Sequence, residues 1–195
     1  MGWRRERFES HEGEVGVLLA DGSEPGPVYF DIGSGTYVHE STDWWVYTGE
    51  LRRPTATSMR GRCACGWRAA RAFPIDWQRV DPADLTAYDV SGPLQDWEAH
   101  MDEVAARAVR LPEDVAGLLK RLYERLDELV DDEPLTVLRA VDRLEAIVGV
   151  YGPMAARLVT GIGEAGGGMV RVAEALGMTE EAAGSRLRHY RYLDF

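Results

Sequence analysis

The stretch GPLQDWEAHMDEVAARA, residues 92–108, marks a change in the pattern of the sequence. Its apolar residues recur at intervals of three and four, which places them on one stripe of an α-helix. These residues are Leu94, Trp97, Met101, Val104, Ala105 and Ala108. Because Gly92-Pro93 is a turn signal directly before the helical pattern, we predict a domain boundary at this point.

Two further amphipathic helices are predicted downstream. Pro112 suits the first position of a helix, and Glu113 and Asp114 complement the positive end of its dipole. The acidic run 131–134 ends this helix and begins the next, so residues 112–150 are expected to form an antiparallel helical hairpin. Their acidic outer face is expected to be solvated, and their apolar stripes to form core. The expected core residues are Val115, Leu118, Leu119, Leu122, Leu126 and Leu129, followed by Val137, Leu138, Val141, Leu144 and Val148.

Upstream of residue 91 the apolar residues occur in short runs separated by Gly, Pro, Asp and Ser. The runs at 15–19, 28–30 and 44–47 are typical of strands in a small antiparallel sheet. The sequence therefore predicts an α+β protein. A β-rich domain (1–91) is followed by an α-helical domain (92–195).

Composition limits the classes of function. The chain has 195 residues, of which 45% are hydrophobic and 28% charged, as in a soluble globular protein. A net charge of −11 argues against coating a nucleic acid or an anionic membrane. No apolar run reaches the roughly 18 residues of a membrane span, and no apolar stretch follows the first arginines, so we expect a cytoplasmic protein without a membrane partner. Catalytic triads, phosphate loops and His-Glu-x-x-His motifs are absent, so we expect no enzyme.

One glycine pattern fits the spacing of dinucleotide-binding motifs. It is Gly161-Ile-Gly163-Glu-Ala-Gly166. Such a motif needs a second strand whose end carries an acidic residue for the ribose, and the sequence after Gly166 is helical instead. We therefore expect a turn between helices and no nucleotide cofactor.

The two cysteines lie in the motif Cys63-Ala-Cys65-Gly66-Trp67. A spacing of one residue strains a disulfide between them, but it allows both thiolates to bind one metal ion. A reducing cytosol also favours a metal or free thiols over a disulfide. In the alternative interpretation, the cysteines pack as small hydrophobic residues against Trp67.

Zinc takes about four nitrogen or sulfur ligands, so histidines must complete such a site. His100 follows Trp97 by three residues on the predicted helix, and this pairing with the C-x-C-G-W motif resembles one in small actinobacterial proteins. His39, at the end of a predicted strand, is the expected fourth ligand. We expect this zinc to be structural, because no neighbouring motif supplies a general base. The candidate ligands are Cys63, Cys65, His100 and His39.

Residues 52–71 form a basic window with six arginines and no acidic residue. With Trp67 among them, these arginines could hold a phosphate backbone and stack a base. They could equally pair with the acidic segments 1–51 and 112–133 of the same molecule. The negative total charge favours this internal neutralisation.

The C-terminal stretch VRVAEALGMTEEAAGSRLRHYRY, residues 170–192, predicts a helix-turn-helix over 169–192. Gly177 follows the first short helix at a position that requires a positive φ. Thr179 is then the N-cap of the second helix, whose first turn carries two glutamates. Such a second helix enters the major groove of DNA. The expected DNA-contacting residues are Thr179, Ser185, Arg186, Arg188, His189 and Arg191.

Within this stretch, VAEALGMTEEAAGSRLR (172–188) resembles the helix-turn-helix of region four of sigma factors, in particular the extracytoplasmic-function type. The resemblance implies a DNA-facing helix that carries Ser185, Arg186 and Arg188 and reads the promoter −35 element. Where that family has a β-branched residue and then a lysine, this chain has Ala183-Gly184. No segment resembles the sigma region that melts the −10 element, so the chain is not a complete sigma factor.

Two functions follow as expectations. The first is a DNA-binding, transcription-associated regulatory protein that contacts duplex DNA with its C-terminal helix. The alternative is a protein–protein interaction module with a zinc-stabilised N-terminal domain, whose helix-turn-helix serves packing or protein contacts. In that case the acidic hairpin or the arginine-rich window would bind a protein partner.

Overall fold

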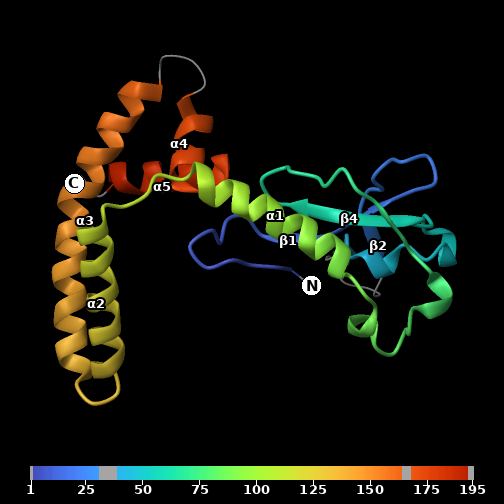
Figure 1. The fold of residues 1–195 in the computed structure, drawn as a ribbon, viewed down its shortest axis with the longest axis horizontal. Coiled ribbons are helices and arrows are strands. Elements are labelled where there is room, and N and C mark those ends of the chain that lie inside the picture. Colours follow the sequence, from blue (N-terminus) through green and yellow to red (C-terminus); the bar gives the residue numbers. More distant parts are fainter. Residues whose placement is uncertain (1, 31–38, 164–167, 193–195) are drawn as a thin grey trace. The chain divides into compact units, whose positions relative to one another are not determined.

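The computed structural model describes residues 2–30, 39–163 and 168–192. Antiparallel strands are followed by helices, which confirms the predicted α+β class (Figure 1). The chain divides into two compact units, residues 1–106 and 107–195.

The first unit is built on a three-stranded antiparallel sheet. Its order is β1 (Gly13–Leu18), β4 (Ser58–Cys63) and β5 (Phe73–Pro74). The register between β1 and β4 runs from Gly13 opposite Cys63 to Leu18 opposite Ser58. Strands β2 (Val28–Phe30) and β3 (His39–Ser41) form a separate antiparallel pair.

The core of this unit lies against β1 and β4. Val15, Val17 and Met59 point into it, because alternate residues of a strand share one face. The expected strand at 44–47 is wrong, because Trp44–Val46 forms a short 3-10 helix, η1. Trp44 and Val46, the first and last residues of η1, are both buried. Residues 44–46 therefore contribute to the core without pairing in a sheet. Three further short helices are η2 (Glu50–Arg52), η3 (Trp77–Arg79) and η4 (Leu85–Ala87).

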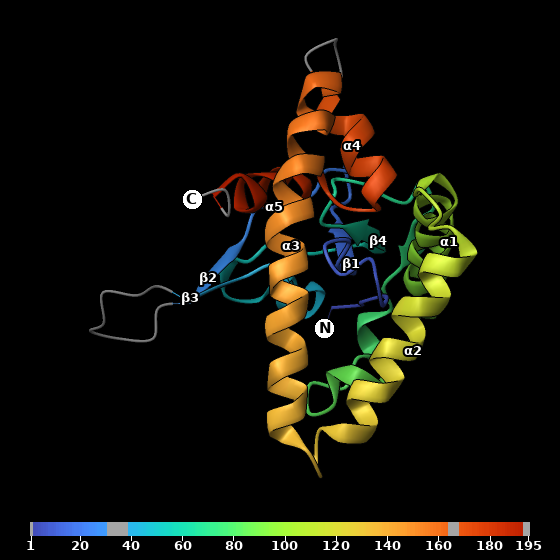
Figure 2. The same cartoon turned by 90° about the vertical axis from the view of Figure 1, so that its left-hand side faces the viewer.

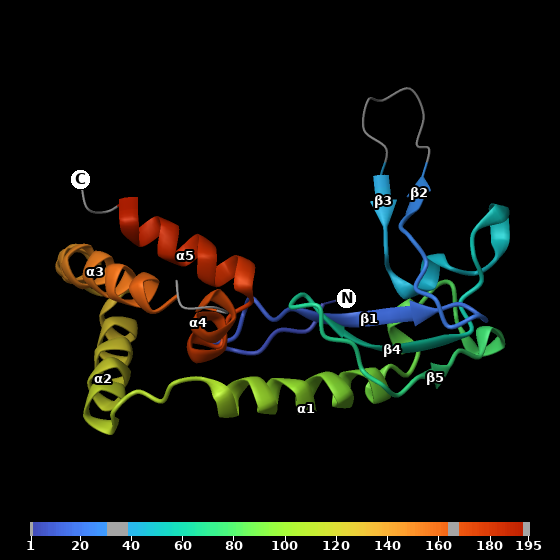
Figure 3. The same ribbon diagram turned by 90° about the horizontal axis from the view of Figure 1, so that it is seen from above.

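Helix α1 (Ser91–Arg107) belongs to the first unit except for its last residue, and it runs beside β4 (Figure 3). Trp97 and Met101 are buried with Cys63 in a second cluster of the core. Glycine is needed where the helix crosses the strands, because a Cβ on Gly61 would lie 2.6 Å from the Pro93 carbonyl oxygen. The boundary between the two units therefore falls at the C-terminal end of this helix, whereas the change in sequence pattern falls before the helix.

The basic window 52–71 is largely neutralised inside the first unit. Glu24 pairs with both Arg60 and Arg68, the latter at 2.9 Å. Arg62 pairs with Glu14 at 3.0 Å, and a fourth arginine, Arg71, pairs with Asp96 at 2.8 Å. The expected pairing with acidic residues of the segment 1–51 is thus confirmed for Glu14 and Glu24.

The second unit contains helices α2 (Glu113–Leu129), α3 (Pro134–Gly163), α4 (Gly168–Leu176) and α5 (Glu180–Tyr192). A short turn joins α2 and α3 in a hairpin (Figure 2). Gly161 and Gly163 of the glycine pattern lie in the last turn of α3, and Gly166 lies outside the described residues. No helix in the described ranges combines the length and the apolar character that a membrane span requires.

The expectation that the hairpin stripes form core is wrong for most of their residues. Leu118, Leu119 and Leu138 are 60%, 52% and 64% exposed, and α2 contains no buried residue. The half-buried stripe residues are Leu122, Leu126, Leu129, Val137 and Leu144. The stripe on α2 spans about 100° of the helix, with Leu118 and Leu119 at its two edges. One neighbouring helix covers the middle of the stripe and leaves these edges exposed.

Candidate metal centre

Strand pairing brings His11 to Cys63. Cys63 ends β4 opposite Gly13, and His11 precedes Gly13 by two residues. The register continues past the strand end, where the Ala64 N–H donates to the Glu12 carbonyl oxygen at 2.9 Å. His11 Nδ1 consequently lies 3.6 Å from Cys63 Sγ, and both residues are buried.

A tight turn after β4 places Cys65 beside Cys63. The Gly66 N–H donates to the Cys63 carbonyl oxygen, and the Cys63 N–H donates to the Trp67 carbonyl oxygen, both at 3.0 Å. Gly66 has a φ of 93°, a conformation that side chains other than glycine rarely adopt. The C-x-C-G sequence therefore turns both sulfur atoms toward one point.

Helix α1 supplies His100. Burial of Trp97 and Met101 fixes the rotation of the helix, and His100 Nε2 lies 3.4 Å from Cys65 Sγ. The imidazole is stacked on the Trp67 ring, with centroids 4.4 Å apart and planes 8° from parallel. The indole thus holds the imidazole in the orientation that faces the cysteines.

The ligand atoms of His11, Cys63, Cys65 and His100 all lie within 4.8 Å of one another. In a tetrahedral zinc site, bond lengths of about 2.3 Å to sulfur and 2.0 Å to nitrogen place neighbouring sulfur and nitrogen atoms about 3.5 Å apart. The two measured sulfur–nitrogen distances, 3.6 and 3.4 Å, agree with this spacing. The cluster could hold a metal ion such as zinc.

Without a metal, a hydrogen bond between the two cysteines shifts their pKa values in opposite directions. The Cys63 thiol donates to Cys65 and so lowers the pKa of Cys65, and hydrogen bonds to His100 and His11 lower it further. The same hydrogen bond, together with burial, raises the pKa of Cys63. The lowered pKa favours the thiolate form of Cys65, which is the form that binds a metal ion. Cys65 is exposed, so this edge of the cluster gives an ion access from solvent.

Three of the four predicted metal ligands come together, and the fourth does not. His39 lies in β3, where it is exposed and its ring centroid is 5.8 Å from that of Phe30. His11 takes the place that His39 was expected to fill. No local motif marks His11, because its position depends on the pairing of β1 with a strand about 50 residues later in the chain.

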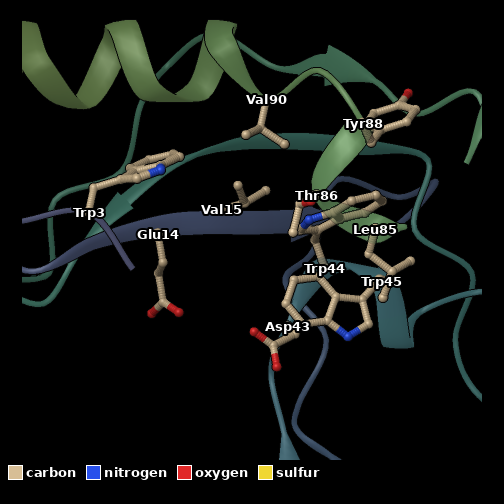
Figure 4. Close-up of a pocket in the computed structure, with 10 residues that line it drawn as sticks. All are labelled: Trp3, Glu14, Val15, Asp43, Trp44, Trp45, Leu85, Thr86, Tyr88 and Val90. Carbon is tan, nitrogen blue, oxygen red and sulfur yellow. The ribbon is translucent and has the colours of Figure 1, made fainter. Parts of the chain in front are cut away.

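A separate pocket of about 200 Å³ lies in the first unit (Figure 4). Its walls include Trp3, Trp44 and Tyr88, and the side chains of Glu14 and Asp43 extend to the same side. Glu14 is paired with Arg62, which neutralises its charge. None of the four metal-site residues lines this pocket, so it is a gap in the aromatic core and no part of the cysteine–histidine cluster.

The second candidate site is the helix-turn-helix of α4 and α5. Gly177 has a φ of 62°, and the Met178 N–H donates to the Ala173 carbonyl oxygen at 2.9 Å, which ends α4. The Thr179 hydroxyl accepts a hydrogen bond from the Ala182 N–H at 3.3 Å, as an N-cap does. Leu187 is buried on the inner face of α5. The local geometry is therefore that of a helix-turn-helix.

The expected DNA-contacting side chains do not share one face. Ser185, Arg186, Arg188, His189 and Arg191 are all exposed. Residues two apart lie about 200° apart around a helix, so Arg186 and Arg188 point in nearly opposite directions. The Arg186 guanidinium donates to the Tyr190 hydroxyl at 3.4 Å, on the flank of α5 away from Arg188.

Comparisons with family models, with curated proteins and with solved structures gave no match to this chain. The resemblance of residues 172–188 to region four of sigma factors rests on those residues alone. The cysteine–histidine cluster and the helix-turn-helix are the two features of the chain that bear on its function.

Proposed function

We propose that the chain is a cytoplasmic DNA-binding protein that takes part in transcription regulation, without enzymatic activity, and that its first unit is stabilised by a structural zinc ion. The observation that carries the DNA-binding part is the capped turn at Gly177 and Thr179 between α4 and α5. This turn holds the second helix with one face buried and the other exposed, which is the arrangement that places a recognition helix in the major groove.

The outer face of α5 is the DNA-contacting surface in this proposal. Ser185, Arg188 and His189 project from it, within about 100° of one another around the helix. Arg188 is the side chain suited to a guanine edge or a phosphate. Thr179 holds the start of the helix, and Arg186 and Arg191 lie at its flank and its C-terminal end.

A structural role for the zinc follows from the closed set of ligands. His11, Cys63, Cys65 and His100 fill the four positions of a tetrahedral ion and leave none for a substrate or water. The ion would join β1, β4 and α1, which are the three elements that carry these residues. Cysteines that serve as metal ligands and form no disulfide suit a reducing compartment such as the cytoplasm.

The test begins with selection of binding sequences from a random-sequence duplex pool by the full zinc-loaded chain. Fluorescence anisotropy on the enriched duplex then compares two variants of α5. Arg188→Ala should weaken binding by about 10- to 100-fold, the usual cost of a lost base contact. Arg186→Ala removes the same charge on the opposite side of the helix and should cost less than about threefold. Failure to enrich any sequence, together with no duplex binding at about 50 mM salt, would contradict the proposal.

A second candidate function is a protein–protein interaction module, and the exposed leucines of the hairpin favour it. Large exposed apolar patches commonly mark sites of protein contact. Replacing Leu118 and Leu138 by Glu should then abolish a protein complex and leave DNA affinity unchanged. If the proposal of DNA binding fails and a complex depends on these two leucines, this second function replaces the first.

A further inference from the structure

The second unit contains an apolar pocket of about 500 Å³ that neither proposed role uses. Helices α3, α4 and α5 all contribute to its lining. Ala156 and Leu187 are its most buried side chains, and Val172 and Ala175 of α4 are half-buried along its wall. Its volume lies in the range of about 300–1,000 Å³ that is usual for small-molecule sites.

Specific close contacts define this pocket. Gly152 of α3 lets the Tyr190 ring approach, because a Cβ at Gly152 would lie 2.8 Å from a ring carbon. The segment before α2 crosses α4, where the Val109 N–H donates to the Ala175 carbonyl oxygen at 2.8 Å. Small side chains at Ala155, Ala156 and Ala175 leave space between the helices. The pocket is thus a consequence of small residues at helix contacts.

Among the described residues that line it, the polar ones are two arginines and a tyrosine, and none of them is acidic. The side chain of Arg171, in α4, makes no hydrogen bond or ion pair with the described part of the chain. Arg186 of α5 donates to the Tyr190 hydroxyl, and its guanidinium carbon lies 6.0 Å from the centre of the Tyr190 ring. Two cations therefore line one apolar pocket, and the described residues of its lining supply no carboxylate for them. A bound anion could accept hydrogen bonds from both guanidinium groups.

We propose that this pocket binds a small amphipathic carboxylate, of the class of a medium-chain fatty acid. The apolar body would lie against Ala156, Val172 and Leu187, and the carboxylate would accept hydrogen bonds from Arg171 and Arg186. An inorganic anion would leave the apolar wall unused, and a neutral hydrocarbon would leave the arginines unpaired. The inference does not depend on DNA binding, because the pocket lies on the flank of α5 away from Arg188.

Titration calorimetry of the full zinc-loaded chain with decanoate tests this proposal, at about 150 mM salt to screen surface charge. We expect saturable binding with one ligand per chain. Decanol, which has the same apolar body and no charge, should bind at least about tenfold more weakly. The net charge of −11 repels anions in general, so a preference for decanoate over decanol requires a local cationic site.

Matched arginine variants then test which arginines bind the carboxylate of decanoate. Arg171→Gln combined with Arg186→Gln should weaken decanoate binding by at least about tenfold. Arg188→Gln makes the same change on the other face of α5 and should leave the affinity within about twofold. All three positions are exposed, so the variants should keep the fold. Equal losses in the double variant and in Arg188→Gln would overturn the assignment.

Methyl NMR separates the pocket from the exposed hairpin, which could also take up an apolar ligand. Decanoate should shift the methyl signals of Ala156, Val172 and Leu187 and leave those of Leu118 and Leu138 unchanged. Shifts confined to the hairpin leucines, no saturable binding, or equal affinity for decanol and decanoate would each overturn the proposal.

Discussion

The two units use similar apolar residues to opposite effect. Met59 and Met101 of the first unit are fully buried, whereas Leu118 and Leu138 of the second unit are 60% and 64% exposed. In the first unit, strands and short helices enclose one cluster, and α1 covers another against Cys63. In the α2–α3 hairpin (112–150), no further layer of the described secondary structure packs on the two helices, so their apolar stripes are largely exposed to solvent. Apolar content therefore does not by itself predict where a core forms.

Loss of the metal should have the largest effect, because it should destabilise the first unit and leave the stability of the second unit unchanged. His11→Ala should remove most of the bound zinc and unfold the first unit, because structural zinc sites contribute about 10 kcal/mol or more to folding. His39→Ala is the matched control and should retain about one zinc per chain. Elemental analysis and thermal unfolding measure both effects. Less than about 0.2 zinc per wild-type chain, or equal zinc loss in the two variants, would contradict the metal site.

Truncation in the buried core should be the next largest effect. Met59→Ala leaves a cavity at a fully buried position and should lower the free energy of unfolding of the first unit by about 2–5 kcal/mol. Urea unfolding followed by tryptophan fluorescence reports on this unit, which contains all the tryptophans of the chain. A change below about 1 kcal/mol would show that Met59 is less enclosed than the structure indicates.

The helix cap in the second unit should contribute less. Thr179→Ala removes the hydroxyl that accepts from the Ala182 N–H and should destabilise α5 by about 1 kcal/mol. Thr179→Ser keeps a hydroxyl at the same place and should recover most of that loss. Hydrogen exchange of the first-turn amides of α5 measures the effect. Equal protection in all three proteins would show that the cap does not hold the helix.

The smallest effect should come from the exposed hairpin. Leu118→Gln should change the free energy of unfolding by less than about 0.5 kcal/mol, because the side chain is 60% exposed. Leu122→Gln, one turn further along α2 and half-buried, is the control and should cost more. Chemical unfolding followed by far-UV circular dichroism compares the two variants. A loss at Leu118 as large as that at Leu122 would show that the hairpin is covered in solution.

Features that depend on near neighbours were predictable from the sequence. Residues 94–107 have a helical spacing, and α1 ends at Arg107. Gly177 and Thr179 were expected to end one helix and begin the next, and the hydrogen bonds of both are present. The turn at Cys65-Gly66 is equally local, since the positive φ of Gly66 brings the two sulfur atoms together.

Features that depend on distant partners were not predictable in the same way. His39 and His11 are equivalent as residue types, and only the register of β1 against β4 places His11 at the cluster. The run 44–47 has strand-like composition, yet the helix η1 lets Trp44 and Val46 fill the core from a loop. The opposed directions of Arg186 and Arg188 follow from helix geometry, but Tyr190 determines what Arg186 contacts.

By itself, the sequence determined the α+β order, the helical periods, the C-x-C-G turn and the capped helix-turn-helix, because each depends on interactions within a few residues. Only the tertiary structure decided the fourth member of the metal site, the unit to which α1 belongs and the exposure of the hairpin leucines. Those features depend on contacts between residues that are tens of positions apart in the sequence. Strand register and the number of packed layers set these contacts, and a local pattern encodes neither.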